Sequence, residues 1–181
     1  MKKHLCAAFL AALTAVGALG CSQKQDGEAM ARQLLDGMTM TQVIETFGEP
    51  HAAGQEEWKR LLNVEDEAVA QMQQQALLYR DVQYLSQQMD LVILLSGTQK
   101  QDTVTDFWFV LQTDEQACLA AEREMAAALQ RQWGAPERVL GDIDSGTMED
   151  GLLWAKWEAA QMEVREDGSG QYCLVITQRV R

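Results

Sequence analysis

Few residues in this chain have the chemistry for catalysis. Beyond residue 20 there is a single histidine, His51, which follows Gly48-Glu49-Pro50 in a segment typical of a loop. A Ser-His-Asp or Cys-His arrangement needs a histidine beside its nucleophile, and a zinc site needs more histidine or cysteine ligands than remain. We therefore predict a non-enzyme without metal or cofactor, and a solvated His51.

Two cysteines, Cys118 and Cys173, remain for the folded part once Cys6 and Cys21 are assigned to an N-terminal leader and its end. Cys118 lies on the apolar stripe of a predicted helix, and Cys173 lies in the last predicted strand. In an oxidising compartment such a pair tends to be bonded, which would stabilise the fold by roughly 3–4 kcal/mol. The alternative is two buried, unpaired thiols, and we predict the disulfide on compartment grounds alone.

Acidic residues dominate the charge of the chain. Its 27 acidic and 15 basic residues give a net charge of −12, and no basic cluster follows the first twenty residues, which argues against nucleic acid as a partner. The segment 141–150 (GDIDSGTMED) is superficially similar to a calcium loop, but its spacing to a bidentate glutamate is wrong for an EF-hand. We interpret it as a solvated acidic turn, and no carboxylate pair is singled out for acid–base work.

Residues 1–20 have the pattern of a lipoprotein signal peptide. Two lysines precede an apolar run that is too short to span a bilayer, and the run ends in Ala18-Leu19-Gly20-Cys21. This ending resembles a bacterial lipobox, although the leucine stands one place later than usual. Acylation of Cys21, with residues 21–27 as a polar tether, would anchor the chain to a membrane, since each buried CH₂ adds ~0.8 kcal/mol. The alternative is an ordinary secretory signal that leaves Cys21 as a free thiol.

The clearest local signals lie between Leu34 and Pro50. They predict a helix over residues 40–47 with a capping box, a hydrophobic staple and a Gly-x-Pro end. The residues of these three signals are Thr39 with Gln42, Met38 with Val43, and Gly48 with Pro50.

Other patterns along the chain predict further helices and strands. Helices are predicted at residues 28–36 and 113–133, the second opening with a capping box of Thr113 and Gln116. Strands are predicted at residues 55–62 around Trp58, 76–84, 88–96, 104–112, 152–158, 161–165 and 172–179, with a hairpin loop at 97–102. Residues 63–75 are equally typical of a helix and of a solvated insert.

The order of these elements is similar in the two halves of the chain. Phe47-Gly48-Glu49-Pro50 corresponds to Trp133-Gly134-Ala135-Pro136, and three strand patterns follow each in the same order. Each half is too small to bury its apolar face well, so we predict that the halves join. The predicted fold class is α+β, with two helix-plus-antiparallel-strand repeats (residues 28–112 and 113–181) and the helices packed on one face of a sheet.

Three aromatic residues, Tyr79, Trp108 and Trp154, fall on strand faces that also carry charged residues. If the opposite face takes the helices, these rings line the uncovered side of the sheet. Exposed tryptophan and tyrosine among charges are typical of anchors in protein interfaces. Alternatively, an N-terminal segment or a neighbouring loop covers them.

A local resemblance to a known family is carried by residues 34–58. The matching positions are Gly37, Met38, Thr39, Gln42, Val43, Gly48, Pro50 and Trp58. They resemble the signature of the SmpA/OmlA (BamE) outer-membrane lipoproteins, which follow G-M-T-x-x-Q-V with a short helix, a G-x-P and a strand containing an aromatic residue. The arrangement of two units is similar to that of the β-lactamase inhibitor protein (BLIP).

These observations favour a non-catalytic envelope lipoprotein that holds another envelope protein. The resemblance implies that its partner belongs to the outer-membrane assembly machinery, and similarity to enteric sorting rules at Ser22 implies the outer membrane, facing the periplasm. The alternative is an inhibitor of a periplasmic or extracellular hydrolase that inserts the acidic segment 141–150 into its target. The sequence predicts neither the identity of the partner nor the oligomeric state.

Overall fold

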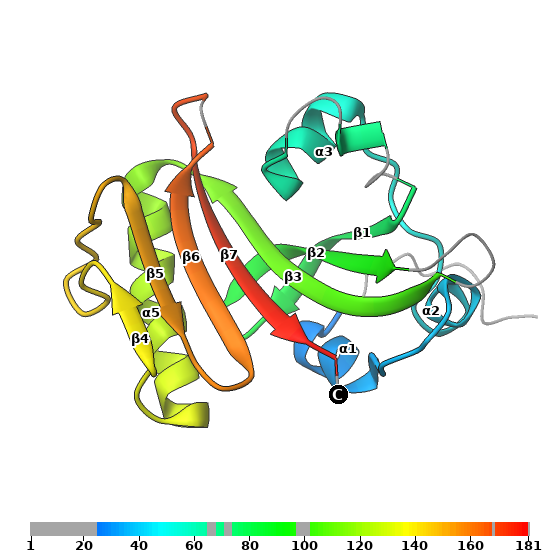
Figure 1. Cartoon of the computed structure of the whole chain (residues 1–181), viewed down its shortest axis with the longest axis horizontal. Helices are drawn as coiled ribbons and strands as arrows, with labels where there is room; N and C mark the ends of the chain where they lie inside the picture. Colours follow the sequence, from blue (N-terminus) through cyan, green and yellow to red (C-terminus); the bar gives the residue numbers. More distant parts are fainter. Residues whose placement is uncertain (1–24, 65–67, 71–73, 97–101, 168, 181) are drawn as a thin grey trace, which may run out of the picture.

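The centre of the fold is one antiparallel sheet of seven strands, in the order β1-β2-β3-β7-β6-β5-β4 (Figure 1). The computed structural model describes residues 25–64, 68–70, 74–96, 102–167 and 169–180. The strands are β1 (Ala76–Tyr84), β2 (Gln87–Ser96), β3 (Thr103–Thr113), β4 (Arg138–Leu140), β5 (Leu152–Lys156), β6 (Ala160–Glu166) and β7 (Tyr172–Arg179). The helices are α1 (Gly27–Gln33), α2 (Met40–Phe47), α3 (Gln55–Leu62) and α5 (Glu115–Trp133).

The two halves of the chain meet at the centre of the sheet, where β3 pairs with β7. The pairing runs in unbroken register from Asp106 opposite Arg179 to Thr113 opposite Tyr172. On one side β1, β2 and β3 are neighbours, and on the other side β7, β6, β5 and β4 are neighbours. No described strand is left outside this sheet.

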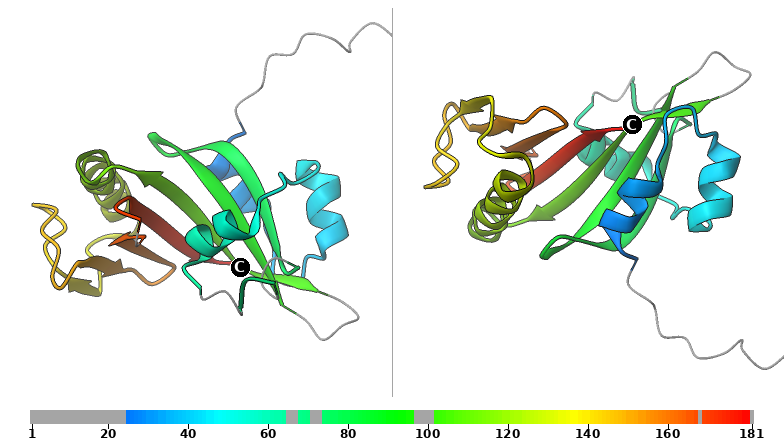
Figure 2. Two further views of the ribbon diagram at one scale, coloured as in Figure 1. Left: turned by 90° about the horizontal axis from the view of Figure 1, so that it is seen from above. Right: turned by 90° about the horizontal axis from the view of Figure 1, so that it is seen from below.

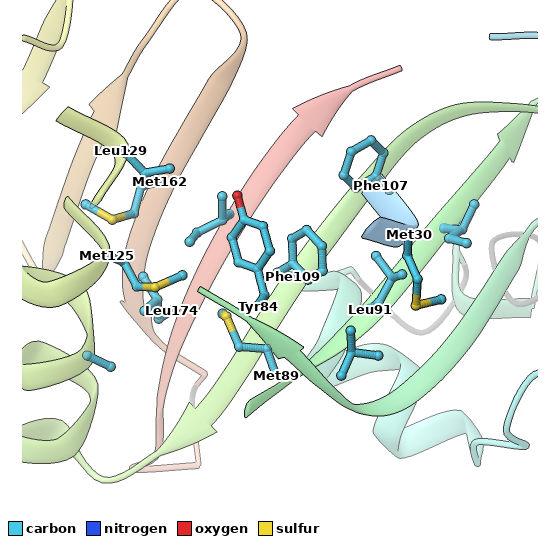
Figure 3. Close-up of a cluster of buried hydrophobic side chains, with 14 of the residues drawn as sticks. Met30, Tyr84, Met89, Leu91, Phe107, Phe109, Met125, Leu129, Met162 and Leu174 are labelled. Atoms are coloured by element: carbon cyan, nitrogen blue, oxygen red, sulfur yellow. The ribbon is translucent and has the colours of Figure 1, made fainter. Parts of the chain in front are cut away.

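One face of the sheet, here called the first face, packs against α1, α2 and α5. Met125 and Leu129 of α5 and Met30 of α1 join sheet residues such as Leu91 in one buried cluster (Figure 3). Apolar residues at helical spacing on α5 give it the stripe that this packing requires.

The opposite, second face is partly covered by α3. Trp58, Leu61 and Leu62 of this helix are buried against Val92 and Val110 and other second-face side chains. Figure 2 shows α3 and α5 on opposite sides of the sheet. Sheet residues with apolar side chains on both faces, as in the middle of β2, need a cover on each side, and α3 supplies the second one.

An ion-pair network fixes α3 to the sheet. Arg80 of β1 lies 2.5 Å from Oε1 of Glu57 on α3 and 3.6 Å from Oδ2 of Asp90 on β2. The side chains of this network are one quarter to one third exposed, so it orients the helix more than it stabilises the fold.

The predicted fold class is wrong. The structure is dominated by its single antiparallel sheet, its helices lie on both faces, and its halves differ: α1, α2 and α3 precede β1, whereas α5 alone lies between β3 and β4. Residues 55–62 form a helix and not a strand, because Trp58, Leu61 and Leu62 recur at i, i+3 and i+4 and face the sheet together.

Smaller differences concern the ends of elements. The first helix ends at Gln33, and α5 is capped by Asp114, whose side chain accepts a hydrogen bond from the Ala117 N–H, and not by Thr113. β4 was not predicted. The leader, Cys21 and most of its tether, six residues of the segment 63–75, and residues 97–101 of the predicted hairpin loop lie outside the described residues.

Candidate functional site

The candidate site is the part of the second face that α3 leaves uncovered. The side chains of β5 and β6 that point to this face are half-buried. α3 lies beside these strands, over the other half of the sheet, and α5 lies behind them (Figure 1). We call this surface the open face, and its residues are Leu152, Trp154, Lys156, Gln161, Glu163 and Arg165.

The strand register arranges the open face into rows. Trp154 lies opposite Glu163, which lies opposite Val175 of β7. Trp108 of β3 begins the neighbouring row at the border with α3, where it packs on the α3 cluster. Three strand spacings, about 14 Å, separate Trp108 from Trp154 across the sheet. The two predicted tryptophans are therefore on one face of the sheet, on strands β3 and β5.

Arg165 is the most confined charged group of the open face. Only 13% of its side chain is exposed, and its Nε lies 2.7 Å from Oε1 of Glu163. Its Nη1 is buried and has no hydrogen-bond partner in the described part of the chain. A buried donor without a partner costs about 1–3 kcal/mol, more when it is charged. Arg165 therefore has hydrogen-bonding capacity that the described part of the chain does not use, and the exposed 13% of its side chain is the part that a bound protein could contact.

Tyr79 does not belong to the open face, contrary to the prediction. It is 1% exposed on the first face, and its ring meets Phe47 edge-on at 6.1 Å between centroids. Its hydroxyl donates a hydrogen bond of 2.9 Å to the Gly48 carbonyl, and burial raises its pKa to about 12. Tyr79 therefore fastens the end of α2 to β1.

The segment 34–58, which carries the family resemblance, also stabilises this fold. Thr39 and Gln42 form the predicted capping box, and Val43 is fully buried. The Val104 N–H donates to the Met38 carbonyl, which ties the start of α2 to β3. Gly48 ends the helix with φ +86°, a conformation that favours glycine, just before Pro50. Gly37 also has a positive φ, +78°, before the helix.

Cys118 and Cys173 are buried free thiols, and the predicted disulfide between them is not formed. Cys118 packs in the cluster on the first face, whereas Cys173 packs in the α3 cluster on the second face. Because side chains alternate along β7, Cys173 points away from α5. Burial raises the pKa of Cys118 to about 12 and that of Cys173 to about 11.

The acidic segment 141–150 is a folded loop that is attached to α5. Ile143 is buried, and Oδ1 of Asp142 accepts hydrogen bonds from the N–H groups of Asp144 and Ser145. Beneath Gly146 lies Glu122 of α5, which is fully buried. The sequence offered a signal for Glu122, since it is one turn after Cys118 and one turn before Met125 on the apolar stripe, but the prediction missed it.

No catalytic arrangement is evident in the described residues. His51 is exposed along the outer edge of β1, where its Nδ1 accepts a long 3.4 Å hydrogen bond from the Arg80 N–H. The described part of the chain contains no group of three or more His, Cys, Asp or Glu side chains that could hold a metal ion.

Comparisons of the chain with protein-family models, with curated proteins and with solved structures give no match. Among the described residues, no helix is long and apolar enough to cross a membrane.

Proposed function

We propose that this chain is a lipid-anchored, non-catalytic protein-binding module of the bacterial cell envelope. In this proposal the open face holds another envelope protein, Cys21 carries the lipid anchor, and the module faces the periplasm at the outer membrane, where it serves outer-membrane assembly or integrity. The observation that carries the proposal is the open face itself, with half-buried Trp154 near the ion pair of Arg165 and Glu163 and no described helix covering them.

The chemistry of the open face specifies what a partner has to offer. The Trp154 ring provides apolar area for an aliphatic or aromatic side chain. Arg165 provides a donor for a carboxylate or a carbonyl oxygen, and Lys156 and Glu163 give charges of both signs on the same surface. A surface that combines an aromatic ring with charges of both signs is typical of protein interfaces.

Photo-crosslinking in intact cells tests the proposed interface. A photoreactive residue placed at position 108 or 154 is expected to capture the same envelope protein, identified by mass spectrometry. The matched control is position 127, because Ala127 is exposed on α5, on the other side of the sheet. Capture at 127 but not at 108 or 154 would refute the assignment of the open face.

The lipid anchor is tested separately. Cells fed a labelled fatty acid are expected to label the chain, and Cys21→Ser is expected to abolish the label and release the protein from the membrane fraction. Unchanged labelling of the variant would refute acylation of Cys21 and would leave the proposed protein-binding surface untested by this experiment.

A second candidate function is inhibition of a periplasmic or extracellular hydrolase. It is favoured by the loop 141–150, which combines exposed Asp142, Asp144 and Glu149 with a backbone held in place by Ile143 and by the Asp142 side chain. Preorganisation of this kind lowers the entropic cost of binding. Saturable inhibition of a purified hydrolase, lost in Asp144→Ala, would support this function.

A further inference from the structure

A groove of about 280 Å³ opens on the first face between α1 and the C-terminal end of α5. Figure 2 shows both helices on the same side of the sheet. Leu35, Arg32 and Glu28 line the wall near α1, and Trp133 lines the wall at the end of α5. Leu35 is 57% exposed, more than any other large hydrophobic residue in the described part of the chain. The groove is therefore concave, apolar at its walls and open to solvent.

The floor of the groove holds a polar group with unused hydrogen-bonding capacity. Tyr84 is 2% exposed, and its ring stacks on Phe109 at 3.7 Å between centroids (Figure 3). Its hydroxyl accepts a 2.5 Å hydrogen bond from Nε2 of Gln178, and its own hydrogen has no acceptor in the described part of the chain. Burial, and to a lesser extent the charge of Glu28, raises the pKa of Tyr84, so the hydroxyl keeps this hydrogen at neutral pH.

The groove has a cation beside it although the whole chain is acidic. The chain has a net charge of −12, yet Arg32 lines the groove, with Glu28 one helical turn before it. Arg179 also borders the groove, but alternation along β7 directs its side chain to the second face, where it lies opposite Asp106. Arg32 forms no ion pair with another described residue. An arginine of this kind near a buried hydroxyl donor fits an anion that accepts hydrogen bonds.

We propose that this groove binds an amphipathic carboxylate, a small acid with an apolar tail such as a medium-chain fatty acid. The carboxylate accepts from the Tyr84 hydroxyl and lies within the field of Arg32, and the tail packs on Trp133 and Leu35. The groove volume of about 280 Å³ is at the lower end of the range of small-molecule sites, which favours a single medium-chain acid over a larger lipid. This inference does not depend on the proposed protein-binding role, because the groove and the open face lie on opposite sides of the sheet.

Binding of decanoate below its micellar concentration tests the proposal. The sample is the chain from residue 22, which contains every residue that the structure describes and has no lipid anchor. Nuclear magnetic resonance is expected to show saturable shifts of the Trp133 indole signal and of the α1 amides. Decylamine, which has the same tail and a positive charge, is expected to bind several-fold more weakly, as is uncharged decanol.

Two substitutions one helical turn apart give a charge test with opposite signs. Arg32→Gln is expected to weaken decanoate binding about two- to fivefold, and Glu28→Gln to strengthen it by a similar factor, as for exposed charge pairs. Arg123→Gln, an exposed position elsewhere on α5, is the control and is expected to have no effect. Tyr84→Phe, which keeps the ring stacked on Phe109, is expected to weaken binding about fivefold.

Three results would overturn the proposal. They are the absence of saturable shifts, equal or tighter binding of decylamine or decanol, and a reversed order of Arg32→Gln and Glu28→Gln. Arg32 is exposed and Glu28 is half-buried, and neither belongs to the core, so the variants are expected to fold. Unfolding curves of each confirm that binding is compared between folded proteins.

Discussion

Glu122 provides a quantitative test of the packing between α5 and the loop 141–150. Its side chain is fully buried, and neither carboxylate oxygen has a hydrogen-bond partner in the described part of the chain. Burial raises its pKa from 4.5 to about 8, with Arg123 opposing the shift and Asp144 and Asp142 adding to it. The glutamate is therefore protonated in the folded protein at neutral pH, whereas it is ionised in the unfolded chain.

The sign of the effect on stability follows from proton linkage. Between pH 4.5 and about 8 the folded state holds a proton that the unfolded state has lost, so unfolding releases a proton and the free energy of unfolding falls as pH rises. Each pH unit in this window contributes about 1.4 kcal/mol. The contribution of Glu122 therefore falls by roughly 3 kcal/mol by pH 7 and by roughly 5 kcal/mol above pH 8.

Glu122→Gln removes this titration and keeps a neutral side chain of the same shape. Urea unfolding from pH 5 to pH 9 is expected to show that the variant gains stability over the parent with rising pH, with a slope of about 1.4 kcal/mol per pH unit that levels off near pH 8. Glu45→Gln, at an exposed position on α2, is the control and is expected to add no such slope. Parallel curves for Glu122→Gln and the parent would refute the buried, protonated Glu122.

Four further predictions concern the fold. Because Cys118 and Cys173 are buried thiols, we expect a thiol reagent to modify neither in the native protein at pH 8 and both after unfolding, and a reductant to leave the melting temperature unchanged. Thr39→Ala removes one bond of the capping box and is expected to cost about 1 kcal/mol in urea unfolding. Trp58→Ala leaves a cavity beneath α3 and is expected to cost about 3–5 kcal/mol. Gly27→Ala places a methyl group 2.8 Å from the nearest side chain and is expected to cost about 1–3 kcal/mol in thermal or urea unfolding.

Local patterns predicted most of the elements of this fold. The strand over residues 76–84 was predicted with its observed bounds, and the helix 40–47 has the predicted capping box and glycine end. The helix at residues 55–62 was mistaken for a strand because Trp58 is typical of strands, and the helical spacing of its apolar residues was overlooked. A short segment cannot be assigned to a helix or a strand from its pattern when its apolar residues fit both the helical period of 3.6 and the strand period of two.

The arrangement of the elements was harder to predict than the elements. Whether Cys173 and Cys118 share a face depends on the register of β7 against β3, which is set by the whole sheet and not by residues near either cysteine. Tyr79 was assigned to the wrong face because the charged neighbour used for the assignment, Asp81, lies in a β-bulge with φ +57°, where alternation breaks. Trp154 was assigned to its face from alternation alone. That assignment is correct because β5 has no bulge and its side chains alternate regularly between the two faces.

The pairing of β3 with β7 has a consequence for folding during synthesis. β7 follows every other strand in the sequence, and it lies in the middle of the sheet between β3, which is made much earlier, and β6, which directly precedes it. Until β7 has been made, β3 has one unpaired edge and the first-face cluster lacks Leu174 and Ile176. Completion of the sheet therefore waits for its last strand, as expected of a topology with many long-range contacts.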